Sequence, residues 1–432
     1  MKASNYNYEI VDNDSVIFFN GITESSFRTS KKNASSFSTI INNPEPHYDT
    51  FKDFIDKMVA QGFIIDESAD ETQLIREKYN ALRKPRVYSI MILPTYQCNL
   101  RCWYCIQDHA NDWMSDEDIQ LIKARLTKMA NNPEIEHLNI SWFGGEPMLA
   151  FDKVLSLTQW TSQLAASTGK GFNATITTNG TLLNEERIIQ LKEAGVDHYQ
   201  ITIDGNREVH NKVKCLNRIS AFDKTLENIG HIIKHSSCTL RFNYTKDNLS
   251  PESIIKDVDA ALPKEGREKM SFLVYKVWQE DESAIPDGEV EKLTELACSI
   301  GLRPRLAVGG MCYADNNYFE CVFTNGKVGK CDNENPDAGI GRITADGDII
   351  WEGDISSHLG IMDNEKSECN SCRYLPMCWG PCSSKRKGML MNEGLIRCQF
   401  ADKEREMGNS IKNARKNEEF INRMKHFQQK AN

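Results

Sequence analysis

The chain has 432 residues, of which 40% are hydrophobic and 26% charged, so it can bury a full core in one large domain with smaller additions. Its formal net charge of −9 argues against a broad basic surface for nucleic acid or anionic membranes. No run approaches the roughly 18 apolar residues of a membrane-spanning helix, and the first residues lack the apolar core of a signal peptide. We therefore expect a cytoplasmic protein that acts on a small molecule or a peptide.

Residues 1–86 are expected to form a small α+β unit. Two short runs rich in β-branched and aromatic residues, an amphipathic run and a last apolar run predict strand, strand, helix and strand. These runs are residues 8–11, 16–19, 48–61 and 62–65. The predicted order is typical of a winged-helix-like module, and the charged stretch 76–86 is its expected boundary.

From residue 87 onward, strands alternate with amphipathic helices, which is typical of βαβ units and a parallel sheet. The six expected strands are residues 87–93, 137–142, 173–178, 198–203, 239–244 and 271–277. Helical patterns between them include residues 116–130, 185–193 and 221–233. Six units predict an α/β fold with a partial (β/α)6 barrel over residues 87–304, and ligands should collect at the C-terminal ends of its strands.

Beyond residue 305 the alternation stops, and Gly, Asn, Asp and Cys become dense. A loop-rich stretch of this kind, residues 305–400, has little hydrophobic core of its own. It needs cross-links to stabilise its fold, and metal clusters can supply them. Residues 401–432 are expected to form a charged helical tail.

The chain has 14 cysteines, and without an export signal metal or redox chemistry explains them better than disulfides. Most of them gather in three groups. The groups are Cys98, Cys102 and Cys105; Cys312, Cys321 and Cys331; and Cys369, Cys372, Cys378, Cys382 and Cys398. The isolated Cys215, Cys238 and Cys298 are expected to be small buried apolar residues.

The first group has C-x3-C-x2-C spacing and directly follows the first expected barrel strand. Three thiolates on one loop can hold three irons of a cubane cluster and leave the fourth iron open, as catalytic zinc sites keep one open position. A zinc site is the alternative, but no fourth cysteine or nearby histidine pair completes it, although His109 is close.

With this loop, residues 87–280 resemble the radical S-adenosylmethionine (SAM) superfamily, whose signature is a triple-cysteine loop after the first barrel strand. The resemblance implies that the amino and carboxylate groups of S-adenosylmethionine chelate the open iron. It further implies a reductive cleavage that releases methionine and a 5′-deoxyadenosyl radical. Tyr104, just before the last cysteine of the loop, matches the family residue that lies near the adenine.

Gly144, Gly145 and Glu146 follow the second expected strand and are followed by Pro147, so this turn resembles the GGEP element of the same family. The resemblance implies contact with the amino group of the cofactor. The chemistry agrees, because glycines allow close approach of backbone carbonyls and a carboxylate accepts hydrogen bonds from an ammonium group.

Two further strand ends are similar to family segments that line the ribose and carboxylate of the cofactor, which implies roles for Asn179 and Thr202. The alternative is that both segments are simple turns, since Asn-Gly and Asp-Gly are strong turn formers. Lys214 stands where family members often have arginine. It keeps the positive charge but cannot grip a carboxylate with two parallel hydrogen bonds.

The later cysteines, with x2, x5 and x3 spacings between residues 369 and 382, resemble the SPASM domain, a C-terminal extension of radical SAM peptide-modifying enzymes. A zinc ribbon, the alternative, has paired C-x2-C units instead. The crossed connectivity of the family implies auxiliary cluster I on Cys312, Cys321, Cys331 and Cys382, and auxiliary cluster II on Cys369, Cys372, Cys378 and Cys398. The chain would then hold three 4Fe-4S clusters, although family members vary at the ligand that Cys321 matches.

Asp332 directly follows Cys331, and the same pair occurs in anaerobic sulfatase maturases, where the aspartate is the proposed base. The resemblance therefore implies a catalytic role in taking the proton left after hydrogen abstraction. A solvated loop aspartate is the alternative.

These resemblances together imply a maturase that oxidatively modifies or crosslinks a ribosomal precursor peptide, with a flavodoxin- or ferredoxin-like reductant. Residues 1–86 would bind the leader of the precursor as an added strand. An anaerobic sulfatase maturase that forms formylglycine and a non-catalytic iron-sulfur electron carrier are the alternatives. The N-terminal unit weighs against the first, and the GGEP-like turn is unnecessary for the second.

Overall fold

The computed structural model describes residues 1–107, 109–216, 219–280, 288–305, 310–333, 340–352, 360–412 and 415. The chain divides into two compact units. The first comprises Met1–Lys84, Ala307–Asn317 and Ser356–Asn432, and the second comprises Pro85–Leu306 and Tyr318–Ile355. The N-terminal segment and most of the cysteine-rich segment therefore belong to one unit, while the division into four domains stays a prediction.

None of the helices in the part of the chain that the structure describes has the length and apolarity that a bilayer crossing needs.

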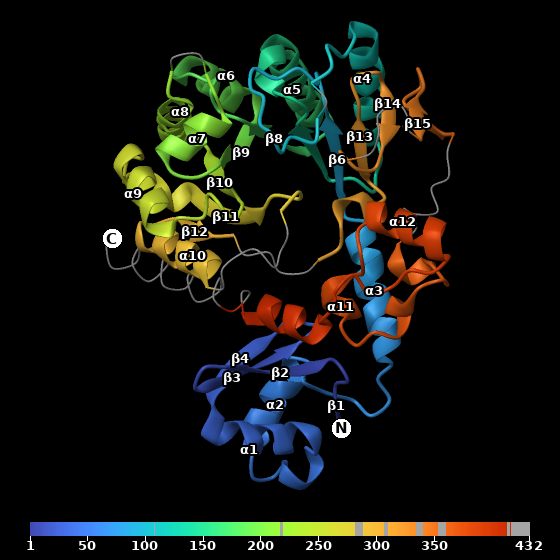
Figure 1. The fold of residues 1–432 in the computed structure, drawn as a ribbon. Coiled ribbons are helices and arrows are strands. Elements are labelled where there is room, and N and C mark those ends of the chain that lie inside the picture. The colour runs from blue at the N-terminus through green and yellow to red at the C-terminus, as the bar shows by residue number, and fades with distance from the viewer. Residues whose placement is uncertain are drawn as a thin grey trace. The chain divides into compact units, whose positions relative to one another are not determined.

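The second unit is built on a single mixed sheet whose largest part is six consecutive parallel strands (Figure 1). They are β6 (Val87–Ile92), β7 (His137–Trp142), β8 (Gly171–Thr178), β9 (Val196–Ile203), β10 (Ser237–Tyr244) and β11 (Met270–Lys276). The predicted α/β fold with a large parallel sheet is confirmed.

Five shorter strands extend this sheet at both edges. They are β12 (Arg303–Pro304) beside β11, β13 (Phe319–Val322) beside β6, and then β14 (Lys327–Gly329), β15 (Gly341–Ile343) and β16 (Ile349–Trp351). Both β12 and β13 run parallel to their neighbours, whereas β14, β15 and β16 are antiparallel. Within the described residues, β6 and β11 do not pair with each other, so the sheet has the open form of a partial barrel.

Helices connect the parallel strands and lie on the outer face of the sheet (Figure 1). They are α4 (Asp116–Ala130), α5 (Phe151–Ser167), α6 (Glu185–Ala194), α7 (Arg207–Val213), α8 (Ala221–His235), α9 (Pro251–Ala261) and α10 (Glu289–Ser299), with 3-10 turns η2 (Pro147–Ala150) and η3 (Arg267–Lys269). Side-chain caps fix several of their starts, such as the capping box of Ser115 and Asp118 at α4.

β6 and β7 bury alternate residues along their whole length, as the period of a half-covered sheet requires. Residues such as Ile90, Ile140 and Ile201 are fully buried in a core with the helices. The opposite face is largely polar, and neighbouring strands exchange side-chain hydrogen bonds there, for example from Asn139 Nδ2 to Ser89 Oγ at 3.4 Å. A polar inner face of this kind suits a binding cavity better than a packed core.

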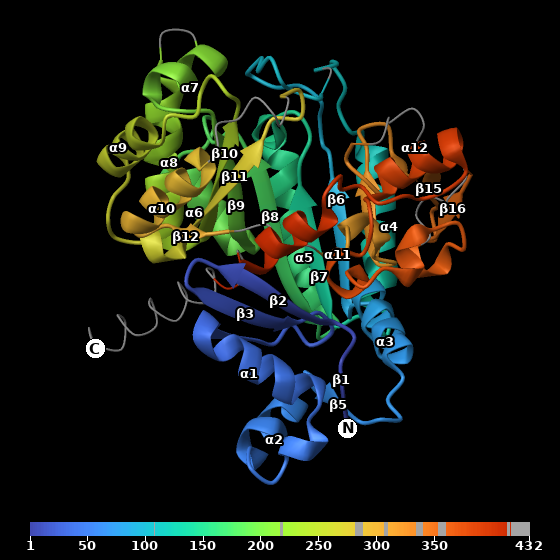
Figure 2. The same cartoon turned by 60° about the horizontal axis from the view of Figure 1, so that its bottom comes forward.

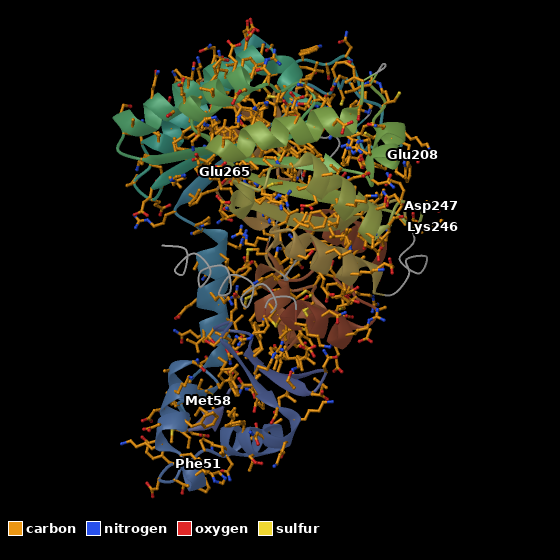
Figure 3. The ribbon with its side chains drawn as sticks, turned by 90° about the vertical axis from the view of Figure 1, so that its left-hand side faces the viewer. Phe51, Met58, Glu208, Lys246, Asp247 and Glu265 are labelled. Atoms are coloured by element: carbon orange, nitrogen blue, oxygen red, sulfur yellow. The ribbon has the colours of Figure 1, made fainter. Side chains whose placement is uncertain are left out.

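Figure 3 shows the two ends of the parallel strands. Glu208, Lys246 and Asp247, which follow β9 and β10, lie at the C-terminal ends of the strands, and Glu265, which precedes β11, lies at the N-terminal ends. The candidate site residues of this unit follow strands and so belong to the C-terminal ends.

The first unit begins with an antiparallel sheet in the order β2-β3-β4. Its elements are β1 (Lys2–Ala3), β2 (Asn7–Asp12), β3 (Ser15–Asn20), β4 (Ser26–Ser30), α1 (Lys31–Asn42), η1 (Glu45–His47), α2 (Lys52–Ala60), β5 (Ile64–Ile65) and α3 (Glu71–Arg83). The predicted hairpin of β2 and β3 is confirmed, with Val11 opposite Val16.

The predicted element order of this segment is incomplete. It lacks β4 and α1, because SFRTS reads as a polar loop and α1 is rich in Ser, Asn and β-branched residues of modest helix propensity. The returning strand β5 pairs with β1 and not with the hairpin. Figure 2 shows α1 and α2 on one face of the sheet, where Val16 and Phe18 form a core with residues such as Ile55.

The cysteine-rich part of the first unit contains only short elements. They are η5 (Tyr313–Asp315), η8 (Ile361–Asp363), η9 (Glu368–Ser371), α11 (Leu375–Cys378) and α12 (Ser383–Glu393). Of the expected helical tail, residues 403–412 are helical and most of the remainder lies outside the described residues.

This cysteine-rich part packs on both sides against the N-terminal segment. Tyr374 stacks on Tyr8 of β2 with ring centroids 5.1 Å apart, and Trp379 lies 5.9 Å from Tyr79 of α3. Arg76 of α3 forms an ion pair with Asp363 at 2.8 Å. Removal of residues 1–86 would therefore remove the contacts that β2 and α3 make with the cysteine-rich part. Such a truncation would disturb the cysteine-rich part as well, so it cannot test the role of the N-terminal segment alone.

Candidate functional site

The loop that follows β6 brings Cys98, Cys102 and Cys105 together. The Cys105 N–H donates to the Cys102 carbonyl at 3.0 Å, and the Leu100 N–H donates to Cys98 Sγ at 3.4 Å. Burial raises the pKa of the Cys98 thiol and raises that of Cys102 to about 11, and the neighbouring thiols add to both shifts. Half-buried thiols of this kind become thiolates when a cation such as cluster iron binds them, so the loop fits a cluster.

The Gly144-Gly145 turn lies directly against this loop. A Cβ on Gly144 would lie 2.5 Å from the Thr95 carbonyl oxygen, and one on Gly145 would overlap the carbonyls of Tyr96 and Gln97. The Gly145 N–H donates to Thr95 O at 3.0 Å. Because the two glycines lack side chains, the main chain of this turn can approach the main chain of residues 95–97 closely. The turn thereby fixes the start of the cysteine loop.

Gly145→Ala should consequently impair cluster binding at the first loop. The added methyl group overlaps main-chain atoms that cannot rotate away, so the loop itself must move. We expect anaerobically reconstituted protein to lose about four irons, the content of one cluster. Gly388→Ala in α12 is the matched control, since a Cβ there meets nothing within 4 Å. Equal iron content in the two variants would contradict the role of this turn.

Glu146 is fully buried, and its carboxylate accepts three hydrogen bonds from the protein. The donors are Met148 N at 3.0 Å, Thr178 Oγ1 at 2.7 Å and Asn179 N at 2.8 Å. Burial raises the pKa of Glu146, and these hydrogen bonds oppose the rise. A carboxylate has about four acceptor positions, so these three donors leave one acceptor position of Glu146 unused. The sequence had suggested a ligand contact, and the structure adds that Glu146 joins the ends of β7 and β8.

Asn179, at the end of β8, reaches the cysteine loop as well. Its Nδ2 donates to Asn99 Oδ1 at 2.8 Å and lies 3.8 Å from Cys98 Sγ. Its Oδ1 accepts from the Thr181 N–H at 2.9 Å. The side chain is therefore held in one orientation beside the first cysteine.

Thr202, Tyr104 and Lys214 meet around the end of β9. Lys214 is only 3% exposed, and its Nζ donates to the Thr202 carbonyl at 2.8 Å. The same Nζ lies 3.4 Å from Asp204 Oδ2, and the Tyr104 hydroxyl donates to Asp204 Oδ1. Burial together with the Asp204 charge raises the pKa of Tyr104, so its hydroxyl stays protonated. The structure thus brings these three predicted residues together through Asp204.

Sequence reasoning missed two polar residues of this region, Asp204 and Arg241. Arg241 on β10 places its guanidinium 4.0 Å from the Tyr275 ring centroid, and its Nε donates to Asn243 Oδ1 at 2.9 Å. Burial lowers the pKa of Arg241, while electrostatic interactions with Tyr275, Tyr104, Asp332 and Asp204 oppose this. Arg241 is the one charged residue of β10, whose sequence is SCTLRFNY, and this was the available signal.

Asp332 thus lies within electrostatic reach of Arg241. Its Oδ1 is 3.9 Å from Cys331 Sγ, and the residue is half-buried. This position is compatible with a proton acceptor near the inner face of the sheet.

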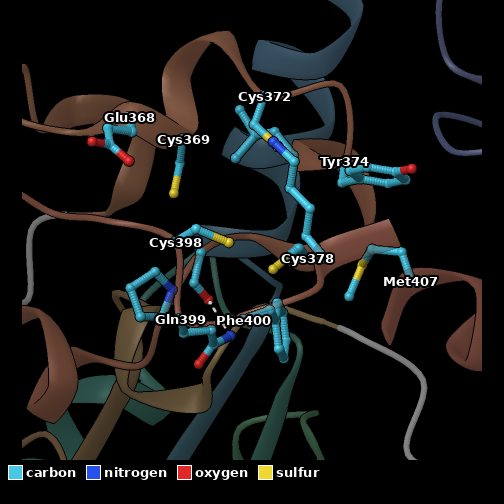
Figure 4. A pocket seen from close by; sticks show the side chains of 13 residues that line it. Glu368, Cys369, Cys372, Tyr374, Cys378, Cys398, Gln399, Phe400 and Met407 are labelled. Atoms are coloured by element: carbon cyan, nitrogen blue, oxygen red, sulfur yellow. Dashed lines mark hydrogen bonds between the residues drawn. The ribbon is translucent and has the colours of Figure 1, made fainter. Parts of the chain in front are cut away.

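In the first unit, four cysteines line one pocket. Figure 4 shows that the sulfurs of Cys369, Cys372, Cys378 and Cys398 point into it. Burial raises the pKa of the Cys369 thiol to about 11, and the other three thiols contribute to that rise. The rest of the wall includes the apolar or aromatic side chains of Tyr374, Leu375, Phe400 and Met407 and the polar side chains of Glu368, Gln399 and Lys403. These are the four residues predicted for auxiliary cluster II, and they fit a four-thiolate site.

Hydrogen bonds also reach the sulfurs of this pocket. The Gly380 N–H and the Gln399 side chain both donate to Cys378 and lower the pKa of its thiol against the effect of burial. Gly380 has φ +76°, and a Cβ there would lie 2.8 Å from Ile361. Glycine is therefore required to turn the chain beside the pocket.

The four cysteines predicted for auxiliary cluster I are divided between the units, and this set stays a prediction. Cys312 and Cys382 belong to the first unit, where Cys382 contributes to the raised pKa of Cys312 after burial. Cys321, which is buried on β13, and Cys331 belong to the second.

Of the isolated cysteines, Cys238 is buried as expected, Cys298 is only half-buried and Cys215 is exposed, so the expectation is confirmed for Cys238 and wrong for Cys215. Across the described residues, no three His, Cys, Asp or Glu side chains are arranged around a single metal ion.

Comparisons with known proteins agree on the second unit. The family model described as the Radical SAM superfamily matches residues 92–258. The AdoMet-dependent heme synthase of Oleidesulfovibrio alaskensis is 29% identical over 36% of this chain and 38% of its own length. The Fe-coproporphyrin III synthase of Methanosarcina barkeri is 30% identical over 38% of this chain and 39% of its own length. The matches thus span less than half of either relative.

Solved structures share the fold over more of the chain. Native anSMEcpe with bound AdoMet, an anaerobic sulfatase maturase, superposes with a TM-score of 0.54 at 19% identity, over 79% of this chain and 100% of that one. Streptococcus suis SuiB bound to the precursor peptide SuiA gives a TM-score of 0.50 at 16% identity, over 93% and 99%. The chain therefore carries a domain of the radical SAM superfamily over residues 92–258.

Proposed function

We propose that this chain is a radical SAM peptide maturase with two auxiliary clusters. The observation that carries the proposal is the three-cysteine loop held against the Gly144-Gly145 turn at the C-terminal strand ends. When bound there, the cluster and S-adenosylmethionine supply a 5′-deoxyadenosyl radical that takes a hydrogen atom from a substrate carbon. Formation of 5′-deoxyadenosine by the reduced, reconstituted protein tests this activity.

The residues around the loop would bind and orient the cofactor. Lys214 has three N–H donors and donates one to the Thr202 carbonyl, while its Nζ forms an ion pair with Asp204 Oδ2 at 3.4 Å, so a further N–H can meet the cofactor carboxylate. The Gly144-Gly145 turn and Glu146 would face its amino group, Asn179 its ribose and Tyr104 its adenine. These roles follow from the family resemblance and from the placement of the side chains at neighbouring strand ends.

The pocket of Cys369, Cys372, Cys378 and Cys398 would hold auxiliary cluster II, and Cys312, Cys321, Cys331 and Cys382 would hold auxiliary cluster I. Four cysteines per cluster leave no open iron, so these sites would pass electrons or support the fold. A flavodoxin- or ferredoxin-like protein would supply the electrons.

A peptide substrate is supported by the solved structures, since SuiB is bound to its precursor peptide and anSMEcpe to a Cp18Cys peptide. The N-terminal sheet of this chain offers an edge for such a peptide. In an antiparallel pair, residues whose main-chain groups bond to the partner strand alternate with residues whose main-chain groups point away from it. Between β3 and β4, Asn20 N donates to Ser25 O and Lys31 N donates to Asp14 O, so Ser25 and Lys31 are of the first kind. The main-chain groups of Ser26 and Ser30 therefore face the outer edge of β4, with which no described strand pairs. The leader of the precursor would add a strand there.

Ser30→Pro tests this edge without removing any packing. Ser30 is exposed and has φ −67°, which proline adopts without strain, but proline removes the outward N–H. We expect the affinity for a fluorescently labelled peptide from a neighbouring reading frame to fall about fivefold or more, the scale of one main-chain hydrogen bond plus a steric conflict. Ser30→Ala, which keeps the N–H, should bind as the wild type does. Equal affinity of the proline and alanine variants would exclude this edge as the leader site.

A further inference from the structure

Asp204 is fully buried, and its carboxylate contacts side chains from separate elements of the fold. The Tyr104 hydroxyl, from the cysteine loop, donates to Oδ1, and Lys214 Nζ, from the end of α7, lies 3.4 Å from Oδ2. The backbone of the same residue is fixed too, because Asn248 Nδ2 donates to its carbonyl at 2.7 Å. Asp204 thus sits in a rigid position between the cysteine loop and the segment that carries Lys214.

Lys214 is the cation that balances this carboxylate. His210 also lies close, with Nδ1 3.7 Å from Asp204 Oδ2, but burial and the Lys214 charge hold the pKa of His210 well below its usual range. The imidazole is therefore neutral, and it accepts the Asp204 N–H at 3.2 Å. A buried carboxylate without a cation would be strongly unfavourable, so Asp204 and Lys214 constrain each other.

This constraint matters because lysine is a flexible point charge, whereas arginine presents a rigid fork. A lysine that must meet a carboxylate in a defined place gains affinity if a neighbour fixes its ammonium before the ligand arrives. Asp204 supplies this restraint, and it fixes the Tyr104 ring through the same carboxylate.

We propose that Asp204 is a positioning residue for S-adenosylmethionine, acting through Lys214 on the carboxylate side of the cofactor and through Tyr104 on the adenine side. The inference rests on the proposed function, since it takes S-adenosylmethionine as the ligand of this site. Asp204 itself need not touch the cofactor.

The test measures the dissociation constant of radiolabelled S-adenosylmethionine by equilibrium dialysis against anaerobically reconstituted protein, so it needs no turnover. Asp204→Asn should raise this constant about tenfold to hundredfold, the scale of losing hydrogen bonds to a charged group, with iron content unchanged. Asp257→Asn is the matched control, because Asp257 accepts the Arg207 N–H at 2.9 Å and contacts neither Tyr104 nor Lys214 in the described structure. Its dissociation constant should equal that of the wild type.

The decisive comparison is made in a Tyr104→Phe, Lys214→Met background. There Asp204→Asn should change the constant less than about threefold, because nothing remains for the carboxylate to position. If Asp204→Asn alone fails to fold, the pair Asp204→Asn with Lys214→Met removes both buried charges and should bind as weakly as Lys214→Met alone. Binding by Asp204→Asn within about twofold of the wild type, or a loss that persists undiminished in the background, overturns the inference. A wild-type protein that binds no S-adenosylmethionine overturns the proposed function itself.

Discussion

Replacing Cys98, Cys102 and Cys105 together by alanine should abolish cleavage of S-adenosylmethionine and reduce the iron content from about twelve to about eight, the loss of one 4Fe-4S cluster. These thiols lie on one loop, and burial raises the pKa of two of them, Cys98 and Cys102, so these two stay protonated unless a cation binds. Without them the open iron that would chelate the cofactor has no ligands. Iron analysis and chromatographic assay of 5′-deoxyadenosine after anaerobic reduction provide the measurement.

The matched control replaces the three isolated cysteines, Cys215, Cys238 and Cys298, by alanine. It removes the same number of thiols, and should retain both the iron and the cleavage. If 5′-deoxyadenosine still forms without the loop cysteines, the reactive cluster lies elsewhere in the chain. A wild-type protein that saturates near about four irons would instead contradict the two auxiliary clusters.

Asp332→Asn should lower the rate of product formation about a hundredfold or more, the usual scale for losing a general base. Asparagine keeps the size and polarity of the side chain but cannot take a proton at neutral pH. Radical generation uses other residues, so a deuterium label on the substrate should still reach 5′-deoxyadenosine. Liquid chromatography with mass spectrometry separates the two readouts in one reaction.

Asp346→Asn serves as the control, because Asp346 is exposed in the turn between β15 and β16. Iron content must be measured beside activity, since Asp332 adjoins the predicted ligand Cys331. Product formation near the wild-type rate, with intact clusters, would show that Asp332 is a loop residue and that water or another group takes the proton.

The repeated strands and helices of the second unit could be predicted closely because their signals are local. Strands such as β7 alternate a half-buried with a buried residue, and helices such as α4 begin at side-chain caps. The strand β13 escaped prediction because it spans only Phe319–Val322 and pairs with β6, far away in sequence. Its buried Glu320 forms an ion pair with the half-buried Arg125, which no local pattern reveals.

The packing of the cysteine-rich part on the N-terminal segment is a second case of this kind. Tyr8 and Tyr79 read as ordinary core residues of a small N-terminal module, yet they contact Tyr374 and Trp379, some 300 residues later. Loop-rich segments lack periodicity, so sequence patterns identify their cysteines but not the surfaces that support them.

The candidate site was accessible to prediction where residue types follow a spaced motif, as in the first cysteine loop and the Gly144-Gly145 turn. It was inaccessible where function depends on burial. Asp204 reads as part of an Asp-Gly turn, and only the structure shows that it is buried between Tyr104 and Lys214. Arg241 likewise has neighbours from four separate segments, which carry Tyr104, Asp204, Tyr275 and Asp332.

The most direct test of a radical SAM peptide maturase is the fate of one hydrogen atom. The reduced, reconstituted protein is incubated with S-adenosylmethionine and a deuterated peptide from a neighbouring reading frame, and the mass of 5′-deoxyadenosine is measured together with that of the peptide. We predict that deuterium appears in 5′-deoxyadenosine and that the peptide loses hydrogen to form an oxidised or crosslinked product. Reconstituted protein that holds all its clusters but forms no 5′-deoxyadenosine, with or without peptide, would contradict this account.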